Sequence, residues 1–153
     1  MAPGADDADI DAVLDAFRRL PPHEDVTPAL AILGEARVPA VAFNNGGRGS
    51  TDKLLEATGL HGHFAHVIGV EGAGVWKPHR SAYRNAADEL GLPPGEIALV
   101  AVHSWDIHGA RRAGLVTGWC SRLEGRVSPV FDGADVAGDD LVDVVERLLQ
   151  LSQ

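Results

Sequence analysis

The sequence predicts an α/β fold in which a parallel sheet of about four strands is flanked by helices. Two observations carry this prediction. Short, continuous apolar runs alternate along the chain with segments whose apolar residues recur every three or four positions. Continuous apolar runs are typical of parallel strands that are buried on both faces. No linker or low-complexity stretch divides the chain, so we expect one domain over residues 1–153.

The expected helices share apolar positions that fall on one face. They span residues 9–20, 27–36, 50–58, 80–90, 107–113 and 139–151. The expected strands each run into a polar or glycine-rich loop. They span residues 38–44, 66–70, 97–102 and 115–120. Thr27 and Ser50 are expected N-caps. Strands that alternate with helices at this spacing indicate βαβ units and a sheet covered on both faces.

Composition narrows the possible partners and cofactors. The 153 residues carry 22 acidic and 13 basic side chains, with a net charge of -9, which disfavours nucleic acid as a partner. The single cysteine, Cys120, excludes an intrachain disulfide and a multi-cysteine metal site. The N-terminus is acidic, unlike a signal peptide, and no apolar run is long enough to span a membrane. We therefore expect a cytoplasmic protein without a membrane partner.

Polar residues gather where the expected strands end, which is where open α/β sheets bind ligands. The expected ligand-binding residues are Asn44, Asn45, Gly46, Arg48 and Trp105, and the expected catalytic residues are Lys77, His103 and Asp106. Backbone amides of a glycine-rich loop, one lysine and a His/Asp pair predict a pocket for a small anion. One carboxylate is a weak magnesium site, so we expect neither a metal nor another cofactor.

Each of these residues also has a structural interpretation. Lys77 could be a surface lysine that precedes a helix, and Asp106 could cap free helix amides without doing chemistry. His103 has a side chain suited to proton transfer near neutral pH, but it could equally bond to the loop backbone. The Asn-Gly-Gly sequence after the first strand fits an ordinary turn as well as an anion cradle.

Three segments, in order, resemble a known superfamily: VAFNNGG, VWKPHRSAY and ALVAVHSWDIHGARRAGL. They are similar to the second, third and fourth motifs of the haloacid dehalogenase (HAD) superfamily, and WDIHGARRAGL is most similar to its type II, L-2-haloacid dehalogenase branch. The resemblance implies a Rossmann-like core. Lys77 and Asp106 match the motifs directly. Asn44 stands where serine or threonine is usual, and Ala101 and His103 stand where serine and asparagine are common.

The resemblance also implies a missing segment. Family members begin with a strand that ends in a D-x-x-G-T-type motif, whose first aspartate is the nucleophile, and no part of this sequence matches it. Residues 9–36 resemble the end of the family's cap domain and its return to the core. We therefore expect a HAD-like core truncated at the N-terminus, without the nucleophile strand and most of the cap.

In the family fold, the lost strand is central, between the strands that correspond to residues 38–44 and 97–102. Its loss would leave two apolar strands facing a gap, with unpaired peptide groups. Either these strands pair directly, or another segment or a second chain donates a strand. We expect a homodimer.

Three functions remain open. The first is a repurposed small-molecule enzyme that uses non-covalent acid/base chemistry, such as proton transfer, elimination or cyclisation, on an anionic substrate. The second is a non-catalytic pseudoenzyme or strand-swapped binding module. The third is a HAD hydrolase that a separate fragment completes. Dehalogenase activity of the isolated chain is not expected.

Overall fold

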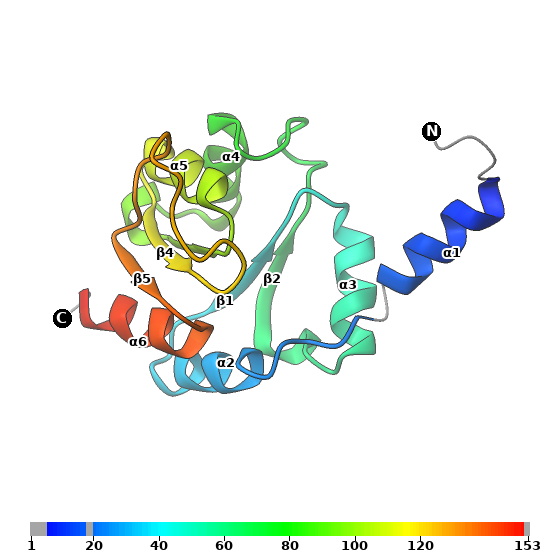
Figure 1. The fold of residues 1–153 in the computed structure, drawn as a ribbon, viewed down its shortest axis with the longest axis horizontal. Helices are drawn as coiled ribbons and strands as arrows, with labels where there is room; N and C mark the ends of the chain where they lie inside the picture. The colour runs from blue at the N-terminus through cyan, green and yellow to red at the C-terminus, as the bar shows by residue number, and fades with distance from the viewer. Residues whose placement is uncertain (1–5, 18–19, 152–153) are drawn as a thin grey trace.

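The computed structural model describes residues 6–17 and 20–151 and has an α/β architecture (Figure 1). Its α-helices are α1 (Asp7–Phe17), α2 (Val26–Glu35), α3 (Arg48–Ala57), α4 (Arg80–Leu90), α5 (Ser104–Ala113) and α6 (Leu141–Leu151). Its strands are β1 (Ala40–Phe43), β2 (Phe64–Ile68), β3 (Ala98–Ala101), β4 (Val116–Cys120) and β5 (Val136–Gly138). Two 3-10 turns, at His61–His63 and Pro94–Glu96, lead into β2 and β3.

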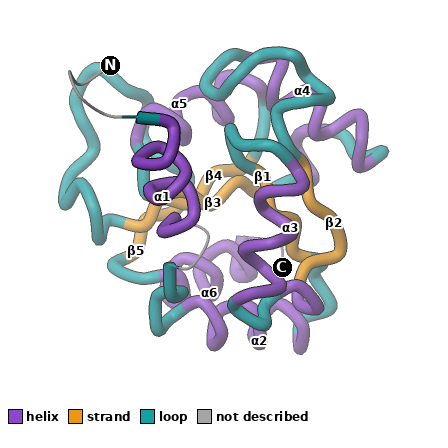
Figure 2. The backbone as a smooth tube through the Cα atoms, turned by 90° about the vertical axis from the view of Figure 1, so that its right-hand side faces the viewer, coloured by secondary structure: helices purple, strands orange, loops and turns teal. Residues whose placement is uncertain are grey.

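The strands form two separate parallel sheets. β1 pairs with β2 in one sheet, and β3, β4 and β5 pair in that order in the other. Within the part of the chain that the structure describes, no strand joins β1 to β3. Figure 2 shows both sheets in the middle layer of the molecule, between α4 and α5 above and α2 and α6 below. The carboxyl ends of β1 and β3 lie close together, because the Lys77 ammonium binds both the Phe43 carbonyl at the end of β1 and Asp106 just after β3.

The α/β class with parallel strands and flanking helices is confirmed, and the structure corrects the details. There are five described strands, because the chain after β4 returns to pair Val136–Gly138 with β4. This strand has only three residues, and two of them are small, so the sequence contains no apolar run that predicts it. β2 begins and ends two residues earlier than expected. The chain leaves the sheet at Gly69, and the next amide, that of Val70, donates to the carbonyl of Gly46.

Both expected N-caps are wrong. α3 begins at Arg48 after Gly47, which has an extended backbone, so Ser50 lies inside the helix. α2 begins at Val26 after Asp25. The Asp25 carboxylate does not cap its own helix, because it accepts hydrogen bonds from the Arg122 guanidinium and the Leu141 amide instead. Distant partners therefore override the local capping signal.

The core lies on the β3–β4 side. Side chains from α4, α5 and β3 form its largest cluster, with the half-buried Phe43 of β1 packed against it. The cluster consists of Tyr83, Leu99, Ala110, Ala113 and Leu115. A smaller cluster under α3 consists of Leu55, Leu60 and Val67. No helix among residues 6–17 and 20–151 is both long and apolar enough to cross a membrane.

The first helix is confirmed as a helix over Asp7–Phe17, and residues 18 and 19 of the expected span lie outside the described residues. It buries no side chain, and Ile10, Val13 and Phe17 are exposed although they form its apolar face. Figure 1 shows α1 projecting away from the sheets.

Candidate active site

A buried ion pair lies at the carboxyl ends of β1 and β3. The Lys77 ammonium donates to Oδ2 of Asp106 at 2.7 Å, and the two side chains are only 9% and 6% exposed. Lys77 comes from the loop after β2, and Asp106 lies in the first turn of α5. A carboxylate is favoured there by the free amides and the positive end of the helix dipole. The structure therefore brings together two residues that the sequence singled out, 29 positions apart.

Tyr83 holds the other oxygen of Asp106. Its hydroxyl donates to Oδ1 of Asp106 at 2.7 Å from α4, and the side chain is completely buried. Burial and the Asp106 carboxylate both raise the pKa of Tyr83 far above its usual value, so the phenol stays protonated. Gly109 permits this contact, because a Cβ there would lie 2.6 Å from the Tyr83 hydroxyl. Both carboxylate oxygens of Asp106 are thus engaged.

The Lys77 ammonium also binds the end of β1. Nζ donates to the Phe43 carbonyl at 3.3 Å and lies 4.7 Å from the centre of the Phe43 ring. An ammonium has three N–H donors, and two are used by Phe43 and Asp106. The third has no partner among the described residues. We call Lys77, Asp106, Tyr83 and the Phe43 carbonyl the Lys77 network.

Asn45 fixes the backbone of Lys77. Its side-chain oxygen accepts from the Lys77 amide at 2.8 Å, and its side-chain nitrogen donates to the Lys77 carbonyl at 3.1 Å. This two-bond bridge joins the loop after β1 to the loop after β2. Asn45 therefore acts on the lysine's position, in addition to any contact with a ligand.

The expected anion cradle contains a carboxylate of the protein itself. Glu71 accepts from the Arg48 amide with both oxygens, at 3.0 and 3.3 Å. Asn44 folds back onto its own loop, accepting from the Gly46 amide and donating to the Thr51 hydroxyl. The Arg48 and Gly46 amides of the loop are thus both engaged by side chains of the protein itself.

His103 lies at the end of β3 beside a second carboxylate. Its Nδ1 is 3.4 Å from Glu124, and its ring stacks on Trp105 with centroids 5.3 Å apart. Glu124 also accepts from the Ser104 amide at 3.0 Å. Hydrogen bonds from Ser104 are the main reason why the pKa of Glu124 lies below its usual value. The Glu124 carboxylate therefore faces His103 as an anion.

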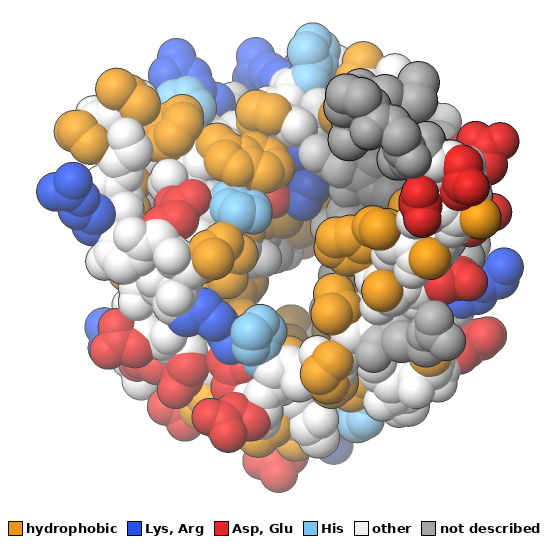
Figure 3. All heavy atoms as spheres, turned by 45° about the vertical axis from the view of Figure 1, so that its right-hand side comes forward, with side chains coloured by type: hydrophobic (Ala, Val, Ile, Leu, Met, Phe, Trp, Pro, Cys, Tyr) orange, Lys and Arg blue, Asp and Glu red, His pale blue; other side chains and the backbone are white. Residues whose placement is uncertain are grey.

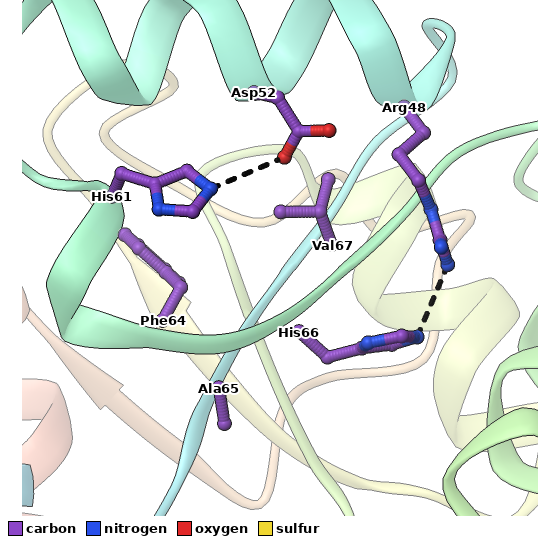
Figure 4. Close-up of a pocket in the computed structure, with 7 residues that line it drawn as sticks. All are labelled: Arg48, Asp52, His61, Phe64, Ala65, His66 and Val67. Carbon is purple, nitrogen blue, oxygen red and sulfur yellow. Dashed lines mark hydrogen bonds and ion pairs between the residues drawn. The ribbon is translucent and has the colours of Figure 1, made fainter.

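The Arg48 side chain belongs to a different group. Its guanidinium pairs with Glu89 and lies 3.1 Å from His66. Glu89 also contacts His66 at 2.7 Å. We call Arg48, His66 and Glu89 the Arg48 cluster. Arg48 and His66 line a pocket of about 220 Å³ between α3 and β2, which Figure 4 shows.

Comparison with known proteins decides the family. A model of the haloacid dehalogenase-like hydrolases matches residues 2–114, which is most of the chain. The chain belongs to the haloacid dehalogenase-like hydrolase family.

Individual family members agree with this assignment. An (S)-2-haloacid dehalogenase of Pseudomonas putida is 32% identical over 107 residues, which cover 70% of this chain and 48% of that enzyme. A haloacetate dehalogenase of Moraxella is 27% identical over 88% of this chain and 58% of that enzyme. The L-2-haloacid dehalogenase structure from Xanthobacter autotrophicus superposes with a TM-score of 0.84 at 25% identity, over 95% of this chain and 68% of that one. The chain thus spans about half the length of the P. putida dehalogenase.

Two residues of this HAD-like site were missed from the sequence. Tyr83 is the chain's only tyrosine and ends the VWKPHRSAY segment, so its place in that motif was a usable signal. Glu124 lies in the irregular loop after β4, and nothing in its neighbouring residues predicts that it reaches His103. Among the described residues, no group of three or more His, Cys, Asp or Glu is placed to hold a metal ion.

Proposed function

We propose that this HAD-like chain forms the strand-end site of a hydrolase that acts on small 2-halocarboxylates, with Lys77 holding the carboxylate that reacts. The observation that supports this proposal most strongly is the third N–H of the buried Lys77 ammonium. It is a fixed charged donor at the ends of β1 and β3 and has no acceptor among the described residues. The names of the (S)-2-haloacid dehalogenases that this chain resembles supply the substrate class.

The chemistry that the family resemblance implies proceeds in two steps. A carboxylate oxygen attacks the carbon that bears the halogen, a C–O bond forms as the C–halogen bond breaks, and the halide leaves with the bonding electrons. Water then hydrolyses the ester, which releases a 2-hydroxycarboxylate and a proton and restores the carboxylate.

Lys77 would keep the attacking carboxylate ionised, because a neighbouring cation favours its charged form. Asp106 is poorly suited to attack, since Lys77 and Tyr83 engage both of its oxygens. Its role would be to hold the ammonium in place. The attacking carboxylate is then a further group that arrives at the free donor of Lys77.

Anion binding tests this proposal. We expect propionate, which stands in for the attacking carboxylate, to bind the 153-residue chain, and the neutral propionamide not to bind, in titration calorimetry. Lys77→Met should weaken carboxylate binding roughly tenfold or more, because it removes a charge-assisted hydrogen bond. Lys53→Met is the matched control, since Lys53 is the only other lysine and is exposed on α3.

The same test has a direct spectroscopic form that does not depend on a variant. Two lysines give two side-chain ¹⁵N resonances, and the ligand should shift that of Lys77 alone. Equal binding by Lys77→Met and the wild type, or a shift at Lys53 instead, would remove the basis of the proposal.

The contact between His103 and Glu124 favours a second candidate, acid/base catalysis without a covalent intermediate. An ionised carboxylate at Nδ1 orients a histidine so that its Nε2 can accept a proton. If His103 is such a base, the chain should catalyse deuterium incorporation into pyruvate in D₂O, and His103→Gln should abolish it. His108→Gln is the control, because His108 lies in α5 and accepts from the Asp132 amide instead of contacting Glu124. Equal exchange by wild type and His103→Gln would exclude this role.

A further inference from the structure

The pocket between α3 and β2 has no residue in common with the Lys77 network. Its volume is about 220 Å³. Pockets for drug-sized ligands are larger, at roughly 300–1,000 Å³, so this pocket suits a smaller molecule. Arg48 and Asp52 of α3 form one wall, and residues from the 3-10 turn at His61 to Val67 of β2 form the rest.

Two opposite charges of α3 lie at this pocket without binding each other. Arg48 and Asp52 are four positions apart, a spacing at which an arginine and an aspartate on a helix are neighbours and can pair. Here each has another partner, because Arg48 pairs with Glu89 and Asp52 meets His61. Figure 4 shows Asp52 and His61 on one side of Val67 and the Arg48 guanidinium on the other. The helix therefore presents a cation and an anion on separate sides of the pocket.

Both charges keep unused hydrogen-bonding capacity. The guanidinium contacts Glu89 and His66 through Nη2 alone, so the N–H groups of its Nε and Nη1 have no acceptor among the described residues. On the other side, Oδ1 of Asp52 lies 3.6 Å from His61, which is too long for a hydrogen bond, and Oδ2 has no donor in the described part of the chain. A ligand could therefore bond to each charge without displacing Glu89.

The pocket wall between these charges is apolar. Val67 is buried, and the half-buried Phe64 packs against the smaller core cluster under α3. Figure 3 shows that charged, histidine and hydrophobic side chains lie close together on the molecular surface around a hollow. A matching ligand has an ammonium, a carboxylate and a short apolar group on one small skeleton.

We propose that the pocket between α3 and β2 binds a free α-amino acid with a short aliphatic side chain. Its carboxylate would accept hydrogen bonds from Nε and Nη1 of Arg48, and its ammonium would donate to Asp52. Its side chain would rest on Phe64 and Val67. Hydrogen bonds between charged groups are roughly twice as strong as neutral ones, so both ends of the zwitterion contribute. The proposal is independent of the function proposed above, because it uses no residue of the Lys77 network.

A zwitterion fits the pocket better than a ligand with a single charge does. A simple anion would be attracted by Arg48 but repelled by Asp52 and Glu89. A simple cation would be attracted by Asp52 but would leave the free donors of Arg48 without an acceptor. An amino acid meets both charges at once, with its ammonium on the side of Asp52.

Backbone amide shifts in ¹H–¹⁵N NMR spectra test the proposal, with L-leucine as the probe. We expect saturable shifts at the amides of Asp52, Ala65 and Val67, with the amides of β5 as the internal reference. 4-Methylpentanoate lacks the ammonium of leucine and 3-methylbutylamine lacks its carboxylate, so each should bind roughly tenfold more weakly. Glycine lacks the apolar side chain and should also bind at least about tenfold more weakly.

Variants assign each end of the ligand to its residue. Asp52→Asn should abolish the preference for leucine over 4-methylpentanoate, and Arg48→Met should abolish the preference for leucine over 3-methylbutylamine. Both variants should keep the fold, because the ion pairs that they break are partly exposed. Glu56→Gln and Arg84→Met are the matched controls at exposed positions of α3 and α4, and both should keep the two preferences.

Equal affinity of the wild type for leucine and 4-methylpentanoate would contradict an ammonium site at Asp52. Equal affinity for leucine and 3-methylbutylamine would contradict a carboxylate site at Arg48. If leucine causes no saturable shift, or shifts only residues outside α3 and β2, the pocket is not an amino-acid site and the proposal is wrong.

Discussion

The Lys77 network and the Arg48 cluster are both charged groups, but they differ in burial. The Arg48–Glu89 pair is the shorter, at 2.5 Å against 2.7 Å for Lys77 and Asp106. However, the Arg48 and Glu89 side chains are 47% and 29% exposed, whereas those of Lys77 and Asp106 are 9% and 6% exposed. Water screens the first pair and supplies alternative partners, whereas each member of the second pair depends on the other. Burial, and not distance, separates a surface contact from a structural and chemical centre.

The largest expected effect follows from removing Asp106. Asp106→Ala leaves the Lys77 ammonium buried without its anion and removes the acceptor of the Tyr83 hydroxyl. We expect the free energy of unfolding, measured by urea denaturation, to fall by about 3–5 kcal/mol.

Asp52→Ala is the matched control for this experiment. The Asp52 carboxylate meets His61 at 3.6 Å, with both side chains at least one-third exposed, and should contribute less than about 1 kcal/mol. Similar losses for the two variants would refute the contrast between buried and exposed pairs.

An effect of intermediate size is expected at Asp25. Burial of Asp25 tends to raise its pKa, but hydrogen bonds from Arg122 and the Leu141 amide outweigh this and lower it. The stabilisation is therefore present above pH of about 4 and is lost as the pH falls through the lowered folded-state pKa. Asp25→Asn should cost about 2 kcal/mol at pH 7 and flatten the fall in stability below pH 4 in urea melts. If the stability of Asp25→Asn falls below pH 4 as steeply as that of the wild type, this assignment is wrong. Asp132→Asn, at an exposed carboxylate, is the control and should leave this pH dependence unchanged.

The smallest effect is expected at the Arg48 cluster. Arg48→Ala and Glu89→Gln should each change the free energy of unfolding by less than about 1 kcal/mol, and added salt should reduce the difference. A double-mutant cycle on the two residues measures their coupling directly. A coupling as large as that between Lys77 and Asp106 would show that burial does not rank the two groups.

The sequence predicted much of the fold because its signals are local. Alternating apolar runs and amphipathic segments located four of the five described strands and all six described helices, although several boundaries moved by two to three residues. The three-residue β5 carries too few apolar residues to register as a strand. Amphipathicity did not reveal that α6 is packed and α1 is not. The pattern shows that a helix has an apolar face, but it does not show which other element, if any, covers that face. α6 packs against α2 and β4, whereas α1 leaves its apolar residues exposed.

The candidate site was predictable only in part. Lys77 and Asp106 follow from their motifs and their places after strands, and the structure joins them. The roles of Tyr83 and Glu124 depend on contacts across 20 or more positions, which no local pattern encodes. The glycine-rich loop was expected to bind a ligand anion, and in the structure its Arg48 amide donates to the Glu71 carboxylate. Arg48 was grouped with the anion site from its position alone, and its side chain turns to Glu89.

Titration of the two lysine side-chain ¹⁵N resonances with propionate tests the central claim most directly. We expect the Lys77 resonance to shift saturably and the Lys53 resonance to stay unchanged, because the Lys77 ammonium has a donor without an acceptor among the described residues. The neutral propionamide should shift neither resonance. A shift at Lys53 alone, or no shift at Lys77 at concentrations where the chain binds propionate, would contradict the proposed hydrolytic site.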